Sequence, residues 1–283
     1  MDKNIFSYYF SSELFESSDM PVHYRFGEYY LSVDSQTPYY ASSNQFCECA
    51  LFGYAVDLVT AQSDRIPERI LMSCNSIDEV IEFEKNLGGK YIIFYKNKDE
   101  YYILGDATCS IPVFYNISGE FACTGNLHYL VNQYGYRPDS KLQRIRDSGD
   151  ISQAMPFDVT QYGEIKQLLP NHYLVANERK AIRFINSDQI QAALTVNEAT
   201  ELVAPLVETI CEFYKTRFKI NCPITSGRDS RVVLAFLLAN GFDGSCYTIK
   251  HPEHSDTTQD IVVPKKLCEA VGVPYSLIQR KMI

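Results

Sequence analysis

The residues with the clearest capacity for chemistry form one short stretch, Thr225-Ser226-Gly227-Arg228-Asp229-Ser230. An apolar run at 220–224 precedes this stretch. A second apolar run at 232–239 follows it and ends at Asn240-Gly241, a common signal for the end of a helix. The sequence therefore predicts a strand, a loop of small residues and a helix that begins at the loop. Backbone N–H groups and the helix dipole in such a loop favour a bound phosphate.

The side chains of the loop fit that chemistry in three ways. Gly227 permits close approach of the backbone to an anion, and the hydroxyls of Thr225, Ser226 and Ser230 are further donors. Asp229 is an anion beside an expected phosphate, which is reasonable if Mg²⁺ lies between them. The stretch is not a Walker loop, because no Gly-Lys-Ser/Thr ending is present. An ordinary turn between a strand and a helix is the alternative, since Gly, Asp and Ser are common in turns.

The elements around the loop predict a parallel sheet in the C-terminal third of the chain. A helix capped by Thr195 or Asn197 comes first, and strands are expected at 220–224, 246–249 and 274–278, with a helix over 258–271 before the last strand. Alternating strands and helices indicate an α/β unit that binds its ligand at the carboxyl ends of the strands. We therefore expect the adenosine half of a nucleotide beside three residues: Ile224, Thr248 and Ile249.

The first two thirds of the chain predict an α+β antiparallel sandwich. Three pairs of apolar runs around polar turns indicate hairpins: 90–95 with 101–106, 111–115 with 121–124, and 171–175 with 181–184. A helix is expected from Ser76, with Glu79 completing a capping box and Gly88-Gly89 ending it. A shorter helix is expected over 127–134.

Composition excludes several classes of protein. The 283 residues carry a net charge of -9, which argues against a nucleic-acid partner. No apolar run has the length of a membrane span, and the N-terminus lacks the order of a signal peptide, so we expect a cytoplasmic protein. The nine cysteines are scattered and are expected to be reduced. Cys47-Glu48-Cys49 lacks a second pair for zinc, and Pro252 prevents a helical turn through His251 and His254, which favours a loop over a metal site.

The loop at 225–230 resembles the pyrophosphate loop Ser-Gly-Gly-x-Asp-Ser of the ATP-pyrophosphatases, and it is most similar to that of the asparagine synthetase family. Thr225 falls on the Ser and Ser226 on the first Gly, and the change of this Gly to Ser is a small departure. The earlier part of the chain resembles the family's glutamine amidotransferase domain, of the Ntn-hydrolase type, in four segments: 51–54, 87–91, 105–115 and 162–174.

The resemblance implies two domains and an activity. Residues 1–186 would be a glutamine amidotransferase-like domain, and 194–283 would be the N-terminal part of an adenine nucleotide α-hydrolase-like ATP-binding domain. The implied reaction is ATP-dependent amide formation, in which a carboxylate is adenylated and an amine then attacks it. Thr225 to Ser230 would hold the phosphates, with Mg²⁺ partly on Asp229. The cofactors would be ATP and Mg²⁺, and the partners a small carboxylate and an amine.

Departures from the family pattern put the glutaminase in doubt. A glutaminase of this type uses an N-terminal Cys as nucleophile, and residue 2 is Asp. Phe52 precedes Gly53 where the family has the Asn of the oxyanion hole, and an apolar ring donates no hydrogen bond. Cys109 and Ile111 replace the Gly and Arg of the motif Asp-x-x-Gly-x-Arg-Pro. We therefore expect this domain to be inactive.

The chain ends at Ile283, after the third expected strand of the parallel sheet. Family members continue with a Gly-rich Asp-Glu segment and with catalytic and acceptor-binding residues. The resemblance therefore implies that a further segment or a second chain completes the synthetase domain, and no catalytic residue is assigned. The alternative is a non-catalytic remnant or partner subunit that keeps the fold and nucleotide binding.

Overall fold

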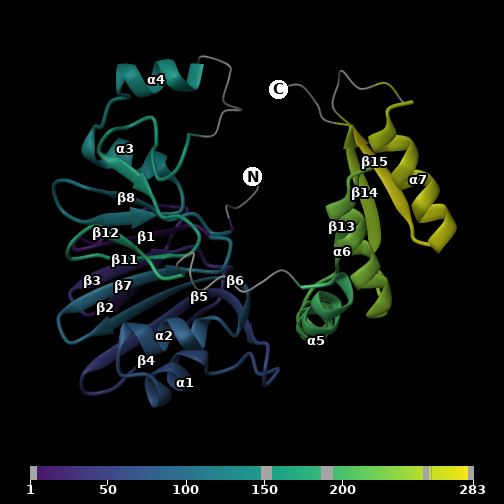
Figure 1. Cartoon of the computed structure of the whole chain (residues 1–283). Coiled ribbons are helices and arrows are strands. Elements are labelled where there is room, and N and C mark those ends of the chain that lie inside the picture. Colours follow the sequence, from purple (N-terminus) through teal and green to yellow (C-terminus); the bar gives the residue numbers. More distant parts are fainter. Residues whose placement is uncertain (1–4, 148–154, 186–193, 251–254, 256, 280–283) are drawn as a thin grey trace. The chain divides into compact units, whose positions relative to one another are not determined.

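The computed structural model describes residues 5–147, 155–185, 194–250, 255 and 257–279 (Figure 1). The chain divides into two compact units, Met1–Ala192 and Ala193–Ile283. Each unit has its own sheets and its own hydrophobic clusters. The two are described separately below.

The N-terminal unit contains two six-stranded sheets in which every strand pair is antiparallel. The first sheet has the order β10-β8-β9-β1-β3-β2, with bounds Ile165–Gln167, Phe114–Asn116, Ala122–Thr124, Tyr8–Ser11, Tyr29–Val33 and Val22–Phe26. The second has the order β12-β11-β7-β6-β5-β4, with bounds Lys180–Arg183, His172–Val175, Glu100–Gly105, Leu87–Asn97, Cys47–Asp57 and Tyr39–Ser43. All three expected hairpins are present in these pairs.

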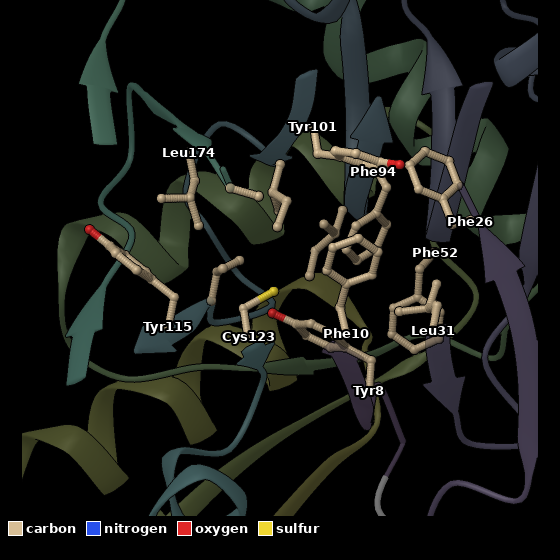
Figure 2. Packing of buried hydrophobic residues seen from close by; sticks show 14 of the residues in the cluster. Tyr8, Phe10, Phe26, Leu31, Phe52, Phe94, Tyr101, Tyr115, Cys123 and Leu174 are labelled. Atoms are coloured by element: carbon tan, nitrogen blue, oxygen red, sulfur yellow. The ribbon is translucent and has the colours of Figure 1, made fainter. Parts of the chain in front are cut away.

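An aromatic core lies between the two sheets (Figure 2). Alternation along the strands sends Phe10 from β1 and Phe94 from β6 into this core, where their ring centroids are 5.0 Å apart. Tyr8 meets Phe52 in the same way at 5.8 Å. Because rings from both sheets interlock here, burial of these large side chains is the main stabilisation of the unit.

Helices cover the outer faces of both sheets. Helices α1 (Ile66–Ser73) and α2 (Ile77–Glu84) pack on the second sheet, where they meet side chains that point away from the aromatic core. Helix α3 (Leu127–Tyr134) packs on the first sheet through Leu130. A fourth helix, α4 (Ser140–Asp147), buries none of its residues. The unit is thus a layered helix–sheet–sheet–helix sandwich, and the predicted antiparallel sandwich is confirmed at this level.

The expected end of α2 at Gly88-Gly89 is wrong. The helix ends at Glu84, and both glycines belong to β6. Gly89 has a φ of 139°, and a Cβ there would lie 2.1 Å from the carbonyl oxygen of Tyr54 on β5. Gly89 therefore permits a close approach of two strands rather than a helix stop, and a single sequence does not distinguish the two uses.

The C-terminal unit is a three-stranded parallel sheet of order β13-β14-β15, with bounds Asn221–Pro223, Ser245–Lys250 and Tyr275–Gln279. The expected parallel arrangement is confirmed. Helices α5 (Val196–Lys215), α6 (Arg228–Ala239) and α7 (Gln259–Val271) alternate with the strands. Thr195 caps α5, and Glu198 completes a reciprocal capping box with it.

Among the described residues, the core of the unit lies on one face of this parallel sheet. Cys222 and Cys246 are register partners whose side chains are buried with residues of α6 and α7. Ile249 and Ile278 are also register partners, and alternation places them on the opposite face, where they are 57% and 47% exposed. Parallel sheets are normally covered on both faces, so this exposure is unusual.

All nine cysteines are unpaired, and eight of them are buried in the two units. Burial raises the pKa of the Cys246 thiol to about 12. The cysteines therefore act as small core side chains. Within the described residues, no helix combines the length and the apolar character that a bilayer span requires.

Candidate functional site

The loop at 225–230 starts where the parallel strand β13 ends and leads directly into α6 (Figure 1). Backbone bonding to β14 fixes Ile224, the residue just before the loop, because the Ile224 N–H donates to the Tyr247 carbonyl oxygen at 2.8 Å. The Thr248 hydroxyl donates to the Ile224 carbonyl oxygen at 2.6 Å. The loop therefore lies at the carboxyl ends of the strands, where ligands bind in parallel α/β sheets.

Three successive backbone N–H groups of the loop donate to side-chain oxygens. Thr225 N–H donates to Ser230 Oγ at 3.1 Å, and Gly227 N–H donates to Thr225 Oγ1 at 3.1 Å. Ser226 N–H donates to Oδ1 of Asp260 at 3.0 Å. All three acceptors are side chains that can rotate away, so an incoming phosphate can replace them without breaking any strand or helix bond.

Asp260 contacts the loop, and the sequence analysis did not identify it. It lies in the first turn of α7, and its carboxylate also accepts a short hydrogen bond from the Ser226 hydroxyl. The sequence did carry a signal for it. An acidic residue just inside the helix that follows the second parallel strand faces the same sheet edge as the loop.

Arg228 and Asp229 occupy the exposed first positions of α6, and Ser230 is half-buried behind them. The positive end of the helix dipole favours the carboxylate of Asp229 there. Within the described residues, no group of three or more His, Cys, Asp or Glu side chains is arranged to hold a metal ion. A Mg²⁺ ion does not require one, because it commonly binds one or two carboxylates together with substrate phosphates and water. The donor set therefore fits a metal that arrives with a nucleotide.

The three residues expected beside adenosine are not equivalent. Ile224 is fully buried in the core of the unit, and Thr248 is buried with its hydroxyl bonded to the chain. Only Ile249 presents an exposed side chain near the end of β14. Ile224 and Thr248 position the loop, and contact of any of the three with a nucleotide stays a prediction.

The departures from a glutaminase site lie mostly within the core of the N-terminal unit. Phe52 packs in the aromatic core between the sheets (Figure 2), and Ile111 is buried in the same cluster. Cys109 has a φ of 48°, and burial raises the pKa of its thiol to about 12. Asp2, His251, His254 and Asp256 lie outside the described residues.

A cavity of about 230 Å³ opens at the start of β1. Its described lining contains no Cys; Lys90, Ser110 and Asn126 are among its polar residues. A thiolate nucleophile is therefore absent from the described walls of this cavity.

Comparison with known proteins gives a distant likeness. No family model and no curated protein matches the sequence. Among solved structures, the chain is similar to glutamine phosphoribosylpyrophosphate amidotransferase from B. subtilis, solved with ADP and GMP, at 12% identity and a TM-score of 0.36. The structure of the allosteric regulatory enzyme of purine biosynthesis gives the same identity and score.

Both likenesses cover 89% of this chain, which spans about half (51%) of the length of each of those chains. The score is too low to establish a common fold. The architecture described above therefore rests on the strand order of this chain itself.

Proposed function

We propose that the C-terminal unit binds the phosphates of ATP at residues 225–230, with Mg²⁺ held partly by Asp229. The observation that carries this proposal is the loop itself. It joins a parallel strand to the N-terminus of α6, and three of its N–H groups donate to replaceable side-chain oxygens. Phosphate oxygens are stronger acceptors than the hydroxyls that receive the N–H groups of Thr225 and Gly227, which favours the exchange at these two groups.

The reaction we assign to this site is that of an asparagine synthetase-like ligase. A carboxylate oxygen attacks the α-phosphorus of ATP, and pyrophosphate leaves. An amine then attacks the acyl carbon, AMP leaves, and the nitrogen releases a proton to solvent as the amide forms. In this scheme the loop holds the pyrophosphate, and the N-terminal unit is an inactive glutaminase. The sequence motif at 225–230 and the burial of Phe52 and Ile111 support this assignment.

A non-catalytic nucleotide-binding role is the second candidate. The exposed pair Ile249 and Ile278 favours it, because no described residue gives the ends of β14 and β15 the cover that parallel sheets normally have. A further segment or a second chain would supply that cover, together with the acceptor-binding residues. In this case the chain alone binds ATP and does not turn it over.

Calorimetric titration with ATP tests the phosphate loop. Asp229→Asn keeps the size of the side chain and removes the charge that balances the metal, so affinity should fall about tenfold with Mg²⁺ and change little in EDTA. Asp243→Asn is the matched control, because Asp243 is an exposed carboxylate in the connection beyond the far end of α6. Equal losses in both variants, or no binding of ATP at millimolar concentration by the parent chain, would show that the loop is only a turn.

Gly227→Val tests whether a phosphate must lie close to the backbone of the loop, and it does so without changing the charge of the loop. Gly227 has a φ of -65°, which any residue adopts, so its backbone conformation does not require glycine. A Cβ there would already lie 3.2 Å from Thr225 Oγ1 and would enter the space that a phosphate needs. We expect binding of ATP to weaken with and without Mg²⁺. Unchanged affinity would place the phosphates elsewhere.

Product analysis distinguishes the two candidates. A ligase releases AMP and pyrophosphate when ATP is mixed with a suitable carboxylate and an amine, whereas a nucleotide-binding remnant does not. The inactive glutaminase is tested by incubating the protein with glutamine and measuring glutamate. Turnover that survives repurification would overturn that part of the proposal.

A further inference from the structure

Asp260 places an anion of the protein on the loop that we assign to phosphate. Its Oδ1 accepts hydrogen bonds from both the backbone N–H and the hydroxyl of Ser226. Ser226 precedes α6, and Asp260 lies in the first turn of α7. The carboxylate therefore lies near the N-terminal ends of two helices of 12 and 13 residues, and both dipoles favour negative charge there.

The same donors cannot serve the carboxylate and a phosphate together. A backbone N–H makes one strong hydrogen bond, so a phosphate that uses Ser226 must displace Asp260. A displaced carboxylate that stays close repels a phosphate oxygen, because like charges a few ångströms apart interact unfavourably. Thr225 and Gly227 differ from Ser226 in this respect, since their acceptors are neutral hydroxyls.

We propose that Asp260 regulates the loop as a built-in competitor, so that metal-free phosphate compounds bind poorly and Mg²⁺ relieves the competition. The inference rests on the proposed function of residues 225–230. A Mg²⁺ ion bound to the phosphates attracts the displaced carboxylate of Asp260. The net repulsion between this carboxylate and the ligand then becomes an attraction. The loop thereby selects the magnesium complex of a polyphosphate over the free anion.

Binding of inorganic pyrophosphate to the full chain tests this role. Asp260→Asn removes the charge and keeps an oxygen that can accept from Ser226. We expect this variant to bind pyrophosphate in EDTA about tenfold more tightly than the parent chain, which corresponds to ~1.4 kcal/mol. The gain should shrink to less than about threefold when Mg²⁺ is present. Asp260→Ala removes the charge without adding an amide. It should also bind pyrophosphate more tightly than the parent chain in EDTA, which would show that the gain does not come from a new contact of the asparagine side chain.

Glu269→Gln is the matched control for charge. Glu269 is an exposed acidic residue on the same helix, nine residues and therefore about 13 Å further along it. It should leave the affinity for pyrophosphate unchanged in EDTA and in Mg²⁺. An equal gain in this variant would mean that net charge, and not the contact with Ser226, controls binding, and would overturn the inference.

The remaining outcomes separate this inference from the proposed function. Binding by the parent chain, with equal or weaker binding by Asp260→Asn in EDTA, would overturn the competitor role and leave the phosphate loop in place. No binding by the parent or by either Asp260 variant would overturn both. The amide resonance of Ser226 gives an independent readout, because it should shift on addition of pyrophosphate as its acceptor changes.

Discussion

Both sheets of the N-terminal unit have side chains buried on their inner and outer faces, whereas the parallel sheet of the C-terminal unit has its core on one face. In the first unit the inner core contains many aromatic residues and the outer clusters include helices. In the second, Ile249 and Ile278 are about half exposed. The same chain therefore contains a unit whose sheets are enclosed and one whose described residues leave two isoleucines exposed near the candidate site.

The largest expected effect tests the enclosed core. Phe94 is fully buried, and its ring lies within 6.3 Å of the rings of Tyr8, Phe10 and Phe26. Phe94→Ala should lower the free energy of unfolding of the N-terminal unit by about 3–5 kcal/mol, because it removes a large side chain and leaves a cavity. Urea denaturation measures this loss. Phe46→Ala, at a position that is 61% exposed, should change little, and a comparable loss there would contradict the layered core.

Leu234→Ala makes the corresponding test in the C-terminal unit. Leu234 is the buried residue of α6 and packs against the parallel sheet. We expect a loss of about 2–5 kcal/mol, confined to the unfolding transition of this unit. Val232→Ala on the same helix, at a position 53% exposed, is the control and should cost far less. If Val232 proves as costly as Leu234, the exposed face of α6 is covered in solution and the contrast between the units is smaller than described.

The close approach of β5 and β6 predicts a smaller loss in the free energy of unfolding when Gly89 is replaced. Gly89→Ala would place a Cβ against the Tyr54 carbonyl oxygen at a positive φ, and we expect a cost on the order of 1–3 kcal/mol. Gly119→Ala is matched in having a positive φ, 73°, with no neighbouring atom within 4 Å of the added Cβ. Thermal unfolding of the two variants separates the steric part of the cost from the conformational part. Equal losses would show that the approach of the strands is not tight.

The smallest effect is a dependence on pH. Burial raises the pKa of the Glu84 carboxyl; the hydrogen bond donated by Tyr91 at 2.8 Å opposes this, and the nearby charge of Asp106 adds to it. The folded state then binds a proton more tightly than the unfolded state. The contribution of Glu84 to stability is therefore greatest below the unfolded pKa of Glu, ~4.3, and is lost as pH rises through the folded pKa.

Glu84→Gln should remove that fall, so the variant should be more stable than the parent at pH 7 and should lose its advantage below pH ~4. Denaturation at a series of pH values measures the difference. Glu178→Gln, at an exposed position in the turn between β11 and β12, should follow the parent at every pH. A parent whose stability rises between acid and neutral pH relative to Glu84→Gln would contradict the assignment.

Much of the fold was predictable because local patterns and the final structure agree. The hairpins follow from alternation around polar turns, and the parallel unit follows from the order of strands and helices. Gly88 and Gly89 were assigned wrongly because a glycine pair that ends a helix has the same sequence as one that lets two strands approach. The strand β1 was missed because Tyr8 to Ser11 is buried on both faces and lacks alternation.

The candidate site was predictable only in part. Residues 225–230 are contiguous, and their spacing alone places them between a strand and a helix. Asp260 is 34 residues from Ser226. Its place at the start of α7 indicates the same sheet edge as the loop, but the contact itself depends on how the two helices lie there, which the sequence does not specify. Ile224 and Thr248 were predicted to lie beside adenosine because of their positions near the carboxyl ends of their strands. Their burial was not foreseen, because alternation in short strands that are buried in part gives a weak signal.

The unpaired cysteines provide a way to follow the opening of each unit separately. Cys222, Cys246 and Cys268 lie together in the core of the C-terminal unit, and Cys47, Cys49, Cys74 and Cys123 lie in the N-terminal clusters. A buried thiol reacts with a disulfide reagent only when its surroundings open, so its labelling rate measures that opening. Mass spectrometry of labelled peptides would resolve two sets of rates. A ligand or a partner that covers the C-terminal unit should slow the labelling of Cys222, Cys246 and Cys268 and leave the other set unchanged.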